Sequence, residues 1–439
     1  MILSLIYSLI VTGSSVTVIL IAVFLVFLKV LKIIVKRKKC QQSDKKRPIV
    51  GLFHPYCNAG GGGERVLWCA IKAMQTSHPE SRYVVYTGDI EVSPDEILRQ
   101  ASKRFNVSLP EPVEFVYLRR RRWIEANMYP YFTLLGQSIG SIYLGLEALL
   151  AVVPDIFIDT TGHAFTLPLF RYLGGCEHVG CYVHYPTITS EMLRRVSSRV
   201  SAHNNRPAVA RSPFLTAGKL LYYRLFAQLY SMAGGAAHIV MVNSSWTEDH
   251  LNRLWNIPLL THRIYPPCDV DDLKALSLER KSKSPYIRIV SVGQFRPEKD
   301  HPLQLRTMYQ LRQMMSDDIW NRIKLVFVGS CRGYEDEKRV SDMKDLCRHL
   351  SLEENVEFKV NVSYEELKEE LTEGIIGLHA MWNEHFGIGI VECMAAGLIM
   401  VAHRSGGPEA DIIVENEGSR NGFLAADEVV CGQIFYKRI

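Results

Sequence analysis

Residues 381–397 read Met381-Trp382-Asn383-Glu384-His385-Phe386-Gly387-Ile388-Gly389-Ile390-Val391-Glu392-Cys393-Met394-Ala395-Ala396-Gly397. The apolar positions after Gly387 predict a helix that begins near Ile388. Gly397 predicts its end, because glycine is favoured just past a helix C-terminus. Glu384 then lies in the loop before this helix and Glu392 in about its first turn. The stretch therefore combines a carboxylate-bearing loop with a helix N-terminus.

This helix N-terminus is a candidate anion site. Unpaired N–H groups and the positive end of the helix dipole favour negative charge, and Gly387 and Gly389 allow a ligand to approach the backbone closely. The two carboxylates can accept hydrogen bonds from hydroxyl groups on either side of the anion. A nucleotide-sugar fits this arrangement, because its diphosphate lies between the sugar and the ribose. The alternative, a charged loop before a buried helix, is the commoner origin of two glutamates at this spacing.

The composition is that of a globular protein of more than one domain. The chain has 439 residues, of which 47% are hydrophobic and 22% charged, so two to three domains with cores are expected. The formal net charge of +5 gives no reason to expect a nucleic-acid partner. The cysteines form no C-x-x-C pair and no zinc-like spacing, so buried thiols in a reducing compartment are expected, Cys176 and Cys181 among them.

Apolar residues fill the beginning of the chain. No charged residue occurs from Ile2 to Leu28, and a helix of this length exceeds the ~30 Å of a bilayer core. A secretory signal would have a shorter apolar region with basic residues before it. Here the basic residues follow: Lys29, Lys32, Lys36, Arg37, Lys38, Lys39, Lys45, Lys46 and Arg47. Residues 1–47 therefore predict one transmembrane anchor and a basic linker, with the remainder of the chain in the cytosol.

Residues 48–270 alternate strands with helices, as in a parallel α/β sheet. Apolar Ile49–Phe53 runs into a turn with four glycines, Gly60 to Gly63, and then into an amphipathic helix. Such a turn suits a phosphate, although it is neither a Walker loop nor a dinucleotide fingerprint, and a plain flexible turn is an equal alternative. Further strands are expected at 83–87, 113–117, 155–159, 180–183 and 238–242.

Two histidines directly follow predicted strands. His163 comes after the strand at 155–159, and His184-Tyr185 after the strand at 180–183. Carboxyl ends of parallel strands lie at one edge of a sheet, where ligands bind. Both histidines are therefore candidates for chemistry, although a histidine hydrogen-bonded locally at a strand end is an equal alternative for each.

The pattern of strand, loop and helix restarts after a polar linker, residues 271–286. Strands are expected at 287–292, 324–329, 356–358 and 375–379. Residues 287–439 then form a second domain, and the economical architecture is two Rossmann-like α/β domains facing one another across a cleft. Two apolar segments, 129–153 and 214–230, are further candidates for contact with a membrane; the first is expected to be a core or interfacial helix rather than a span.

Several motifs in the same order resemble the retaining glycosyltransferases of the GT-B fold, glycosyltransferase family four. The resemblance covers residues 48–425. It rests on the glycine-rich first turn and the Glu384/Glu392 pair, and on four further blocks: Asn243-Ser244-Ser245, Tyr265-Pro266-Pro267, Val292-Gly293 with Pro297-Glu298-Lys299, and Ser405-Gly406-Gly407-Pro408.

Longer strings narrow the resemblance within that family. His54-Pro55-Tyr56-Cys57-Asn58-Ala59-Gly60-Gly61-Gly62-Gly63-Glu64-Arg65, His184-Tyr185-Pro186-Thr187 and Trp382-Asn383-Glu384-His385-Phe386-Gly387 resemble the GDP-mannose-dependent α-1,2-mannosyltransferases. These enzymes add the fourth and fifth mannoses to the dolichol-pyrophosphate-linked oligosaccharide at the endoplasmic reticulum. The resemblance implies GDP-mannose, this lipid-linked acceptor and the membrane as partners. Other mannosyltransferases of the pathway are candidate partners.

The resemblance also implies roles for single residues. Glu384 would hold mannose hydroxyls, Glu392 the ribose, and Lys299 the diphosphate, which Gly62 and Gly63 would approach from the first, acceptor-binding domain. Phe386, Gly387 and Ile388 would complete the donor site, and His184 and Tyr185 would lie on the acceptor side. A protein nucleophile is not implied, because the leaving phosphate is thought to accept the proton of the acceptor.

Three features of the sequence differ from the usual pattern of the family or allow another interpretation. The family usually has an arginine after the glycine of the phosphate loop, where this chain has Gln294, so Arg296 is expected to supply the second charge. His163 stands where many relatives have a histidine that contacts the donor. Asp269-Val270-Asp271 spells a metal-binding D-x-D signature of another fold, but helix capping is the better explanation, and neither a metal nor another cofactor is expected.

Only fourteen residues follow Ala425, whereas the family continues with helices. Residues 429–436 lack a clear amphipathic pattern and are expected to have little to pack against, so the C-terminal domain is expected to be truncated and less stable. The rival functions are another GT-B glycosyltransferase with a lipid acceptor, a nucleotide-sugar epimerase of the same architecture, and a catalytically inactive membrane protein that only binds pathway partners.

Overall fold

The computed structural model describes residues 2–42, 47–199, 209, 211–279, 284–331 and 333–438, with side chains from Ile19 onward. The chain forms two compact units. The first comprises Met1–Met241 and His250–His262, and the second comprises Val242–Asp249 and Arg263–Ile439. Lys45 and Lys46 of the basic linker and residues 280–283 of the polar linker lie outside the described part of the chain.

The first unit is built on a seven-stranded sheet with the order β3-β2-β1-β4-β5-β6-β7. β1 pairs in parallel with β2 on one side and with β4 on the other, and this order is that of a doubly wound Rossmann sheet. All five residues of β1 are buried, as expected for a central parallel strand. The strands are β1 (Ile49–Phe53), β2 (Arg82–Thr87), β3 (Glu114–Tyr117), β4 (Ile156–Asp159), β5 (His178–Val183), β6 (Ile239–Val242) and β7 (Thr261–Arg263).

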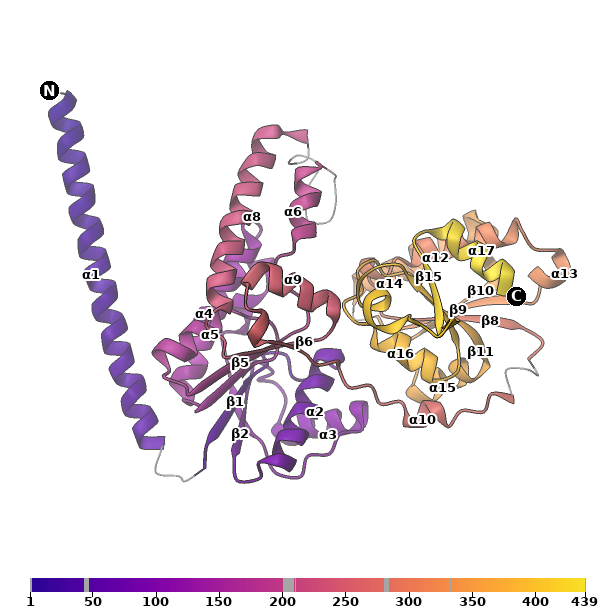
Figure 1. The fold of residues 1–439 in the computed structure, drawn as a ribbon, viewed down its shortest axis with the longest axis horizontal. Coiled ribbons are helices and arrows are strands. Elements are labelled where there is room, and N and C mark those ends of the chain that lie inside the picture. The colour runs from indigo at the N-terminus through magenta and orange to yellow at the C-terminus, as the bar shows by residue number, and fades with distance from the viewer. Residues whose placement is uncertain are drawn as a thin grey trace. The chain divides into compact units, whose positions relative to one another are not determined.

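Helices cover both faces of this sheet (Figure 1). Val50 and Leu52 point to the face where α2 (Gly62–Ser77) and α3 (Pro94–Phe105) bury their apolar sides. On the other face, the rings of Phe157 and Phe170 stack with centroids 3.6 Å apart. The remaining helices of the unit are α4 (Thr133–Ala151), α5 (Thr166–Pro168), α6 (Ser190–Ser197), α8 (Pro213–Gly234) and most of α9 (Ser245–Trp255).

α1 (Ile2–Gln42) is one continuous helix. Its apolar side chains from Ile19 to Ile34 are largely exposed, Leu31 excepted. Among its described side chains, those of the last turns dock on the first unit. Val35 is buried, and Lys39 Nζ lies 3.3 Å from Asp155 and donates to the carbonyl of Gly175 at 2.9 Å. Among the side chains that the structure describes, α4 is the one helix long and apolar enough to cross a membrane. Of its most apolar stretch, 39% is buried inside the first unit.

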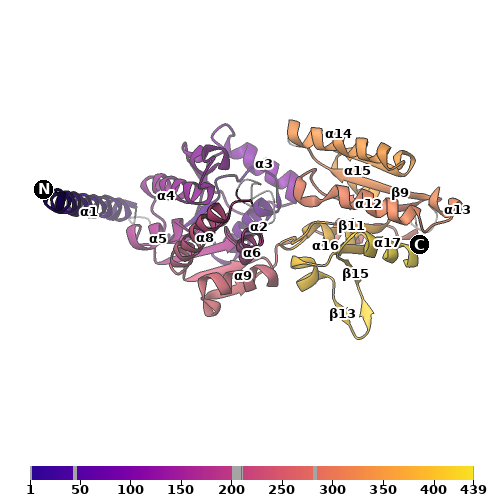
Figure 2. The same ribbon diagram turned by 90° about the horizontal axis from the view of Figure 1, so that it is seen from above.

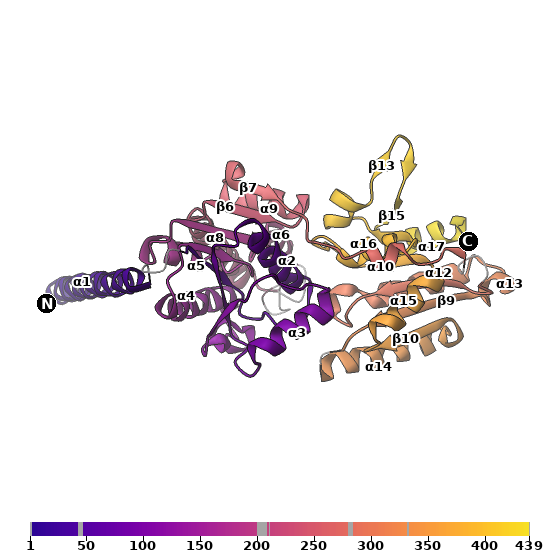
Figure 3. The same ribbon diagram turned by 90° about the horizontal axis from the view of Figure 1, so that it is seen from below.

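The second unit repeats the topology with a six-stranded sheet, order β10-β9-β8-β11-β12-β15. Figures 2 and 3 show its helices in two further views. α12 (His301–Arg312) and α14 (Tyr334–His349) pack on one face, and α10 (Asp271–Lys274), α15 (Tyr364–Glu373) and α16 (Ile388–Ala395) on the other. The strands are β8 (Ile287–Val292), β9 (Ile323–Gly329), β10 (Val356–Val360), β11 (Gly374–His379), β12 (Ile399–His403) and β15 (Gly422–Ala425), and α13 (Asp317–Trp320) and the hairpin β13 (Glu415–Asn416) and β14 (Ser419–Arg420) complete the unit.

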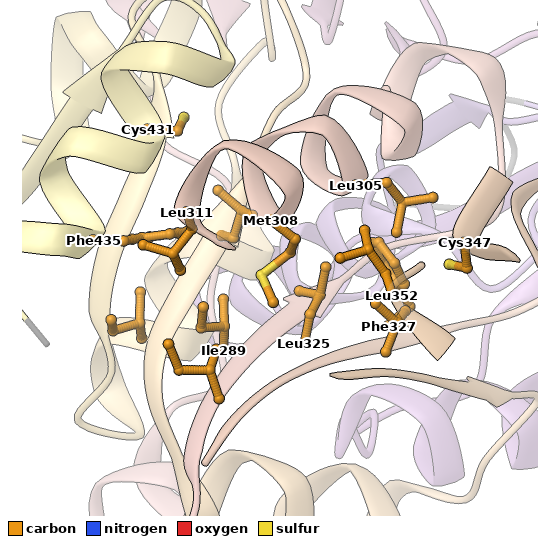
Figure 4. Packing of buried hydrophobic residues seen from close by; sticks show 14 of the residues in the cluster. Ile289, Leu305, Met308, Leu311, Leu325, Phe327, Cys347, Leu352, Cys431 and Phe435 are labelled. Atoms are coloured by element: carbon orange, nitrogen blue, oxygen red, sulfur yellow. The ribbon is translucent and has the colours of Figure 1, made fainter. Parts of the chain in front are cut away.

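The prediction that residues 429–436 have little to pack against is wrong. Residues Glu428–Arg438 form a helix, α17. Cys431 and Phe435, four residues apart and thus on one helical face, are buried in the core cluster with Ile289 and Leu311 (Figure 4). The amphipathic pattern of this helix is not visible in the sequence, because Val429 and Tyr436 are also apolar although they are exposed.

We expect Phe435→Ala to lower the free energy of unfolding by about 3–5 kcal/mol, because a fully buried ring would leave a cavity. The neighbouring Tyr436 is 53% exposed, so Tyr436→Ala is the matched control and should cost less than about 1 kcal/mol. Denaturant unfolding measures both. Equal stability of the two variants would contradict the packing of α17.

Candidate active site

The loop that carries Glu384 joins β11 to α16, at the carboxyl edge of the second sheet. Two residues of this loop have left-handed backbone angles, Asn383 with φ 53° and Gly387 with φ 113°. Gly387 is the N-cap of α16, and glycine is favoured there because a side chain would be strained at this φ. The helix begins at Ile388, and Gly397 follows its end with φ 79°, both as predicted.

The Glu384 side chain is 14% exposed, and its carboxylate has three hydrogen-bond partners. Its Oε2 accepts from Lys299 Nζ at 2.6 Å and from His379 Nε2 at 3.0 Å, and its Oε1 accepts from the backbone N–H of His385 at 3.1 Å. Burial alone would raise the pKa of Glu384. The His379 hydrogen bond and the Lys299 ammonium group outweigh burial and hold the pKa well below its usual range. Glu384 is therefore ionised at neutral pH and can accept hydrogen bonds from hydroxyl groups.

A second turn supports this loop from behind. Ser405 Oγ accepts from Asn383 N at 2.7 Å, and Gly407 N donates to the carbonyl of Glu384 at 2.8 Å. A Cβ atom on Gly406 would stand 2.2 Å from that carbonyl oxygen, and one on Gly407 would stand 2.6 Å from the Phe386 backbone. The Ser405-Gly406-Gly407 block is thus glycine-rich because two backbones meet there.

Lys299 reaches Glu384 from the loop that follows β8, at the end of the 3-10 turn Pro297–Lys299. Its aliphatic chain lies over Gly293, where an added Cβ would be 3.5 Å from Lys299 Cδ. The Arg296 side chain is partly exposed and lies 3.8 Å from Glu298, while its backbone carbonyl accepts from Lys299 N at 3.1 Å. The role of its guanidinium group as a second charge stays a prediction. Asp300, with φ 43°, ends this loop and caps α12 through its side chain.

The N-terminus of α16 lies directly beside this carboxylate. Phe386 is buried, whereas Ile388 and Gly389 are half-buried. Glu392 is also half-buried and follows Ile388 by four residues, about one helical turn. The chain thus places an ionised carboxylate, an ammonium group and a helix N-terminus around one edge of the sheet. This arrangement can bind a ligand that carries both hydroxyl groups and an anion.

The other predicted residues lie at the carboxyl edge of the first sheet. Gly62 and Gly63 begin α2, and a Cβ on Gly63 would be 3.5 Å from His184 Nε2. His184 Nε2 bonds the carbonyl of Thr160 at 3.1 Å, so it carries hydrogen there. Tyr185 is 39% exposed. His163 follows β4. Burial lowers the pKa of His163, and the nearby Asp159 carboxylate offsets only part of this lowering.

Sequence reasoning missed a buried polar network in this region. His54 Nδ1 lies 2.7 Å from Thr160 Oγ1, and His54 Nε2 lies 3.7 Å from Glu64 Oε1. Glu64 Oε2 accepts from the backbone N–H of Gly61 at 2.6 Å and so holds the glycine-rich turn. Burial raises the pKa of Asp159, whose Oδ2 has no hydrogen-bond partner among the described residues. His54 and Glu64 lie on either side of the glycine turn in the sequence. Their position beside the turn is the sequence feature that could have indicated this network.

The D-x-D sequence, Asp269-Val270-Asp271, lies at the start of α10. α10 begins at Asp271, as predicted, but its N-cap is Val270 and no side chain caps it, so the capping explanation for Asp269 and Asp271 is wrong. Within the described ranges, no group of three or more His, Cys, Asp or Glu side chains could hold a metal ion. All ten cysteines are free thiols, and Cys176 and Cys181 are buried as predicted.

His301, beside Lys299, should make stability depend on pH. Burial, with Lys299, Arg339 and His379 nearby, lowers its pKa to about 4, against about 6.5 in an unfolded chain. The unfolded state therefore binds more protons between these values, and stability falls as the pH drops below 6.5. The loss should be about 2 kcal/mol at pH 5.

His301→Phe keeps a ring against Phe295, whose centroid lies 5.2 Å from that of His301, and should remove most of this pH dependence. His349→Phe, at an exposed position of α14, is the control and should keep it. Urea unfolding at pH 7 and pH 5 measures the difference. If the free energy of unfolding of His301→Phe changes between pH 7 and pH 5 as much as that of the unsubstituted chain, the assignment is contradicted.

Comparisons with known proteins agree with this geometry. Residues 47–255 match the family described as ALG11 mannosyltransferase N-terminus, and residues 277–430 match Glycosyl transferases group 1. The GDP-Man:Man(3)GlcNAc(2)-PP-Dol alpha-1,2-mannosyltransferase of Homo sapiens is 52% identical over 402 residues, which cover 91% of this chain and 82% of the relative. The protein of the same name from Dictyostelium discoideum is 45% identical over 390 residues, 88% and 76% of the two chains.

Solved structures agree on the fold alone. Anabaena HepE in complex with UDP and glucose has a TM-score of 0.57 at 17% identity, covering 88% of this chain and 89% of its own. Sucrose-phosphate synthase from Thermosynechococcus elongatus has a TM-score of 0.58 at 15% identity, with 89% of both chains covered. Two parallel-sheet α/β domains of the GT-B type are thus shown. From the sequence identities, the chain belongs to the family of GDP-Man:Man(3)GlcNAc(2)-PP-Dol alpha-1,2-mannosyltransferases, the ALG11 family.

Proposed function

We propose that this chain is a glycosyltransferase that moves mannose from GDP-mannose, in α-1,2 linkage, to the dolichol-pyrophosphate-linked oligosaccharide from which N-glycans are made. The names of its relatives state this donor and an acceptor with three mannoses. The observation that carries the proposal is the ionised Glu384 carboxylate, held 2.6 Å from Lys299 Nζ beside the N-terminus of α16. Addition of the fifth mannose would repeat the reaction on the first product.

In the donor site, each group has a separate task. Glu384 would accept hydrogen bonds from mannose hydroxyls, and Glu392 from the ribose. Lys299 has three N–H donors, so it can keep its bond to Glu384 and also bind the diphosphate. Arg296 and the backbone at Phe386, Gly387 and Ile388 would add further positive potential. Departure of GDP builds negative charge, which this fixed ammonium group and helix terminus stabilise without reorganisation.

The reaction would retain the configuration at the sugar carbon. The bond between mannose C1 and the GDP phosphate oxygen breaks, and C1 bonds the acceptor 2-hydroxyl oxygen on the same face. The acceptor proton passes to the leaving phosphate oxygen. The charges are then balanced by Lys299, Arg296 and the helix terminus, so we propose a reaction without metal or other cofactor.

In the first unit, we assign Gly62 and Gly63 to an anion site at the start of α2, and His184 and Tyr185 to the acceptor side. His163 is assigned to the donor. The support for these roles is their common position at the carboxyl edge of the sheet, where His184 Nε2 already donates to Thr160 O.

We also propose that α1 anchors the enzyme in the endoplasmic reticulum membrane as a single span, with both α/β domains in the cytosol. Support comes from the exposed apolar residues of α1 and the basic residues of its last turns. α4 and α8 add exposed apolar side chains on the first unit, and we propose that they touch the membrane surface: Ile139, Ile142, Tyr143, Phe214, Leu221, Leu225 and Met232.

A transfer assay tests the proposal against its rivals. Purified full-length chain is given radiolabelled GDP-mannose and a dolichol-linked oligosaccharide with three mannoses, and the lipid-linked product is treated with an α-1,2-mannosidase. Label that this enzyme releases supports the proposal. Label transferred only from UDP-sugars would favour another GT-B enzyme, and absence of transfer from all donors would favour an inactive binding protein.

We expect Glu384→Ala and Lys299→Ala each to lower turnover at least ~100-fold, since each removes a contact that stabilises the transition state. Exposed Glu369→Ala and Lys338→Ala in the same unit are the matched controls and should transfer mannose normally. Steady-state transfer rates, with expression levels compared, measure the effect. Near-normal transfer by either site variant would refute the assignment.

The proposed topology predicts that protease added to sealed microsomes digests the chain after α1, because the body lies outside the lumen. Immunoblotting with an antibody against the second unit follows the digestion, and a lumenal protein serves as the protected control. Protection of the body until detergent is added would reverse the topology.

A further inference from the structure

Two short pieces of chain belong to the second unit although they precede its sheet: Val242–Asp249 and Arg263–Tyr265, together called here the crossover segment. Two aromatic side chains of this segment contact the residues directly after Glu384. Trp246 stacks on His385 with ring centroids 5.7 Å apart, and Tyr265 stacks on Phe386 at 5.4 Å. The interplanar angles are 28° and 30°, so both pairs are nearly parallel.

A buried carboxylate joins the two pieces of the crossover segment. Asp411 has 2% of its side chain exposed. Its Oδ2 accepts from Ser245 N at 2.8 Å, and its Oδ1 accepts from Tyr265 OH at 2.9 Å and from Ser245 Oγ. Arg263 Nη1 lies 3.8 Å from the same oxygen and provides the opposite charge.

These contacts form a continuous chain of interactions around the Glu384 loop. Asp411 belongs to the short helix Pro408–Ile412, which directly follows Gly406 and Gly407. Those glycines press against the backbone of Glu384 and Phe386. The loop is thus held between the glycine turn and the two aromatic rings, and Asp411 ties the glycine turn to the segment that carries the rings.

We propose that Trp246, Tyr265 and Asp411 are positioning residues, which set the place of the Glu384 carboxylate without touching the substrate. The inference rests on the proposed function, in which Glu384 holds the sugar. A shift of about 1 Å in a catalytic group can lower a rate 10²-fold, whereas stacked rings and a buried acceptor resist such a shift.

The test compares turnover with nucleotide affinity in the full-length chain. Trp246→Leu and Tyr265→Phe should lower kcat for mannose transfer about 10-fold, while the Kd of GDP, which lacks the sugar, stays within about 2-fold. Trp246→Phe keeps a ring against His385 and should restore most of the rate. Tyr309→Phe, on exposed Tyr309 of α12, is the matched control for Tyr265→Phe.

Glu384→Ala is measured in parallel, so that a failure of the positioning role can be distinguished from a failure of the proposed function. If Glu384→Ala abolishes transfer and Trp246→Leu and Tyr265→Phe transfer normally, the positioning role is wrong and the proposed function stands. If GDP affinity falls together with the rate, or if Trp246→Phe is as slow as Trp246→Leu, the residues support the fold generally and the inference is overturned. Normal transfer by Glu384→Ala would remove the site assignment and this inference with it.

Discussion

The arrangement of the second unit depends on keeping one buried carboxylate charged. Removing an ionised carboxylate from water costs several kcal/mol unless opposite charge and hydrogen bonds replace the water. At Glu384, Lys299 and His379 provide them. Lys299 follows β8 and His379 ends β11, and these two strands pair directly in the sheet. The strand order thus brings together groups that are 80 residues apart in the chain.

The two units share the order of six strands, with β7 as an additional edge strand in the first, but they treat their acidic residues differently. In the second unit, partners from adjacent strand ends hold Glu384 ionised at the edge where the sugar is expected. In the first unit, Glu64 holds the backbone of Gly61 and pairs with His54, which in turn bonds Thr160. That carboxylate shapes a turn, and its hydrogen-bonding capacity is used within the protein. Repetition of a topology therefore does not imply repetition of a chemical role.

Much of the fold could be predicted because apolar strands and glycine turns are local signals. The strands β1, β8, β9 and β11 and the start of α16 were confirmed to within a residue or two. β12 and β15 were not predicted, although β12 is as long as β1. α17 was missed because Val430, Cys431, Ile434 and Phe435 pack on the core while the equally apolar Val429 is exposed, so no clean helical periodicity appears in the sequence. Asp411 could not be found at all, since its partners Ser245 and Tyr265 are more than a hundred residues away in the chain. His379 was missed although it is only five residues from Glu384, because a histidine at the end of a strand does not reveal which way its ring turns.

The crossover segment bears on how such enzymes can diversify. The regions that match the two families end at residue 255 and begin again at 277, so a genetic exchange in the interval would look harmless in sequence. It would nevertheless combine Ser245 and Trp246 of one parent with Asp411 and His385 of the other. A hybrid gene would fold two intact sheets and yet inherit mismatched partners around its donor glutamate. Lineages that acquire new donor domains by recombination must therefore carry this small segment along or evolve it anew.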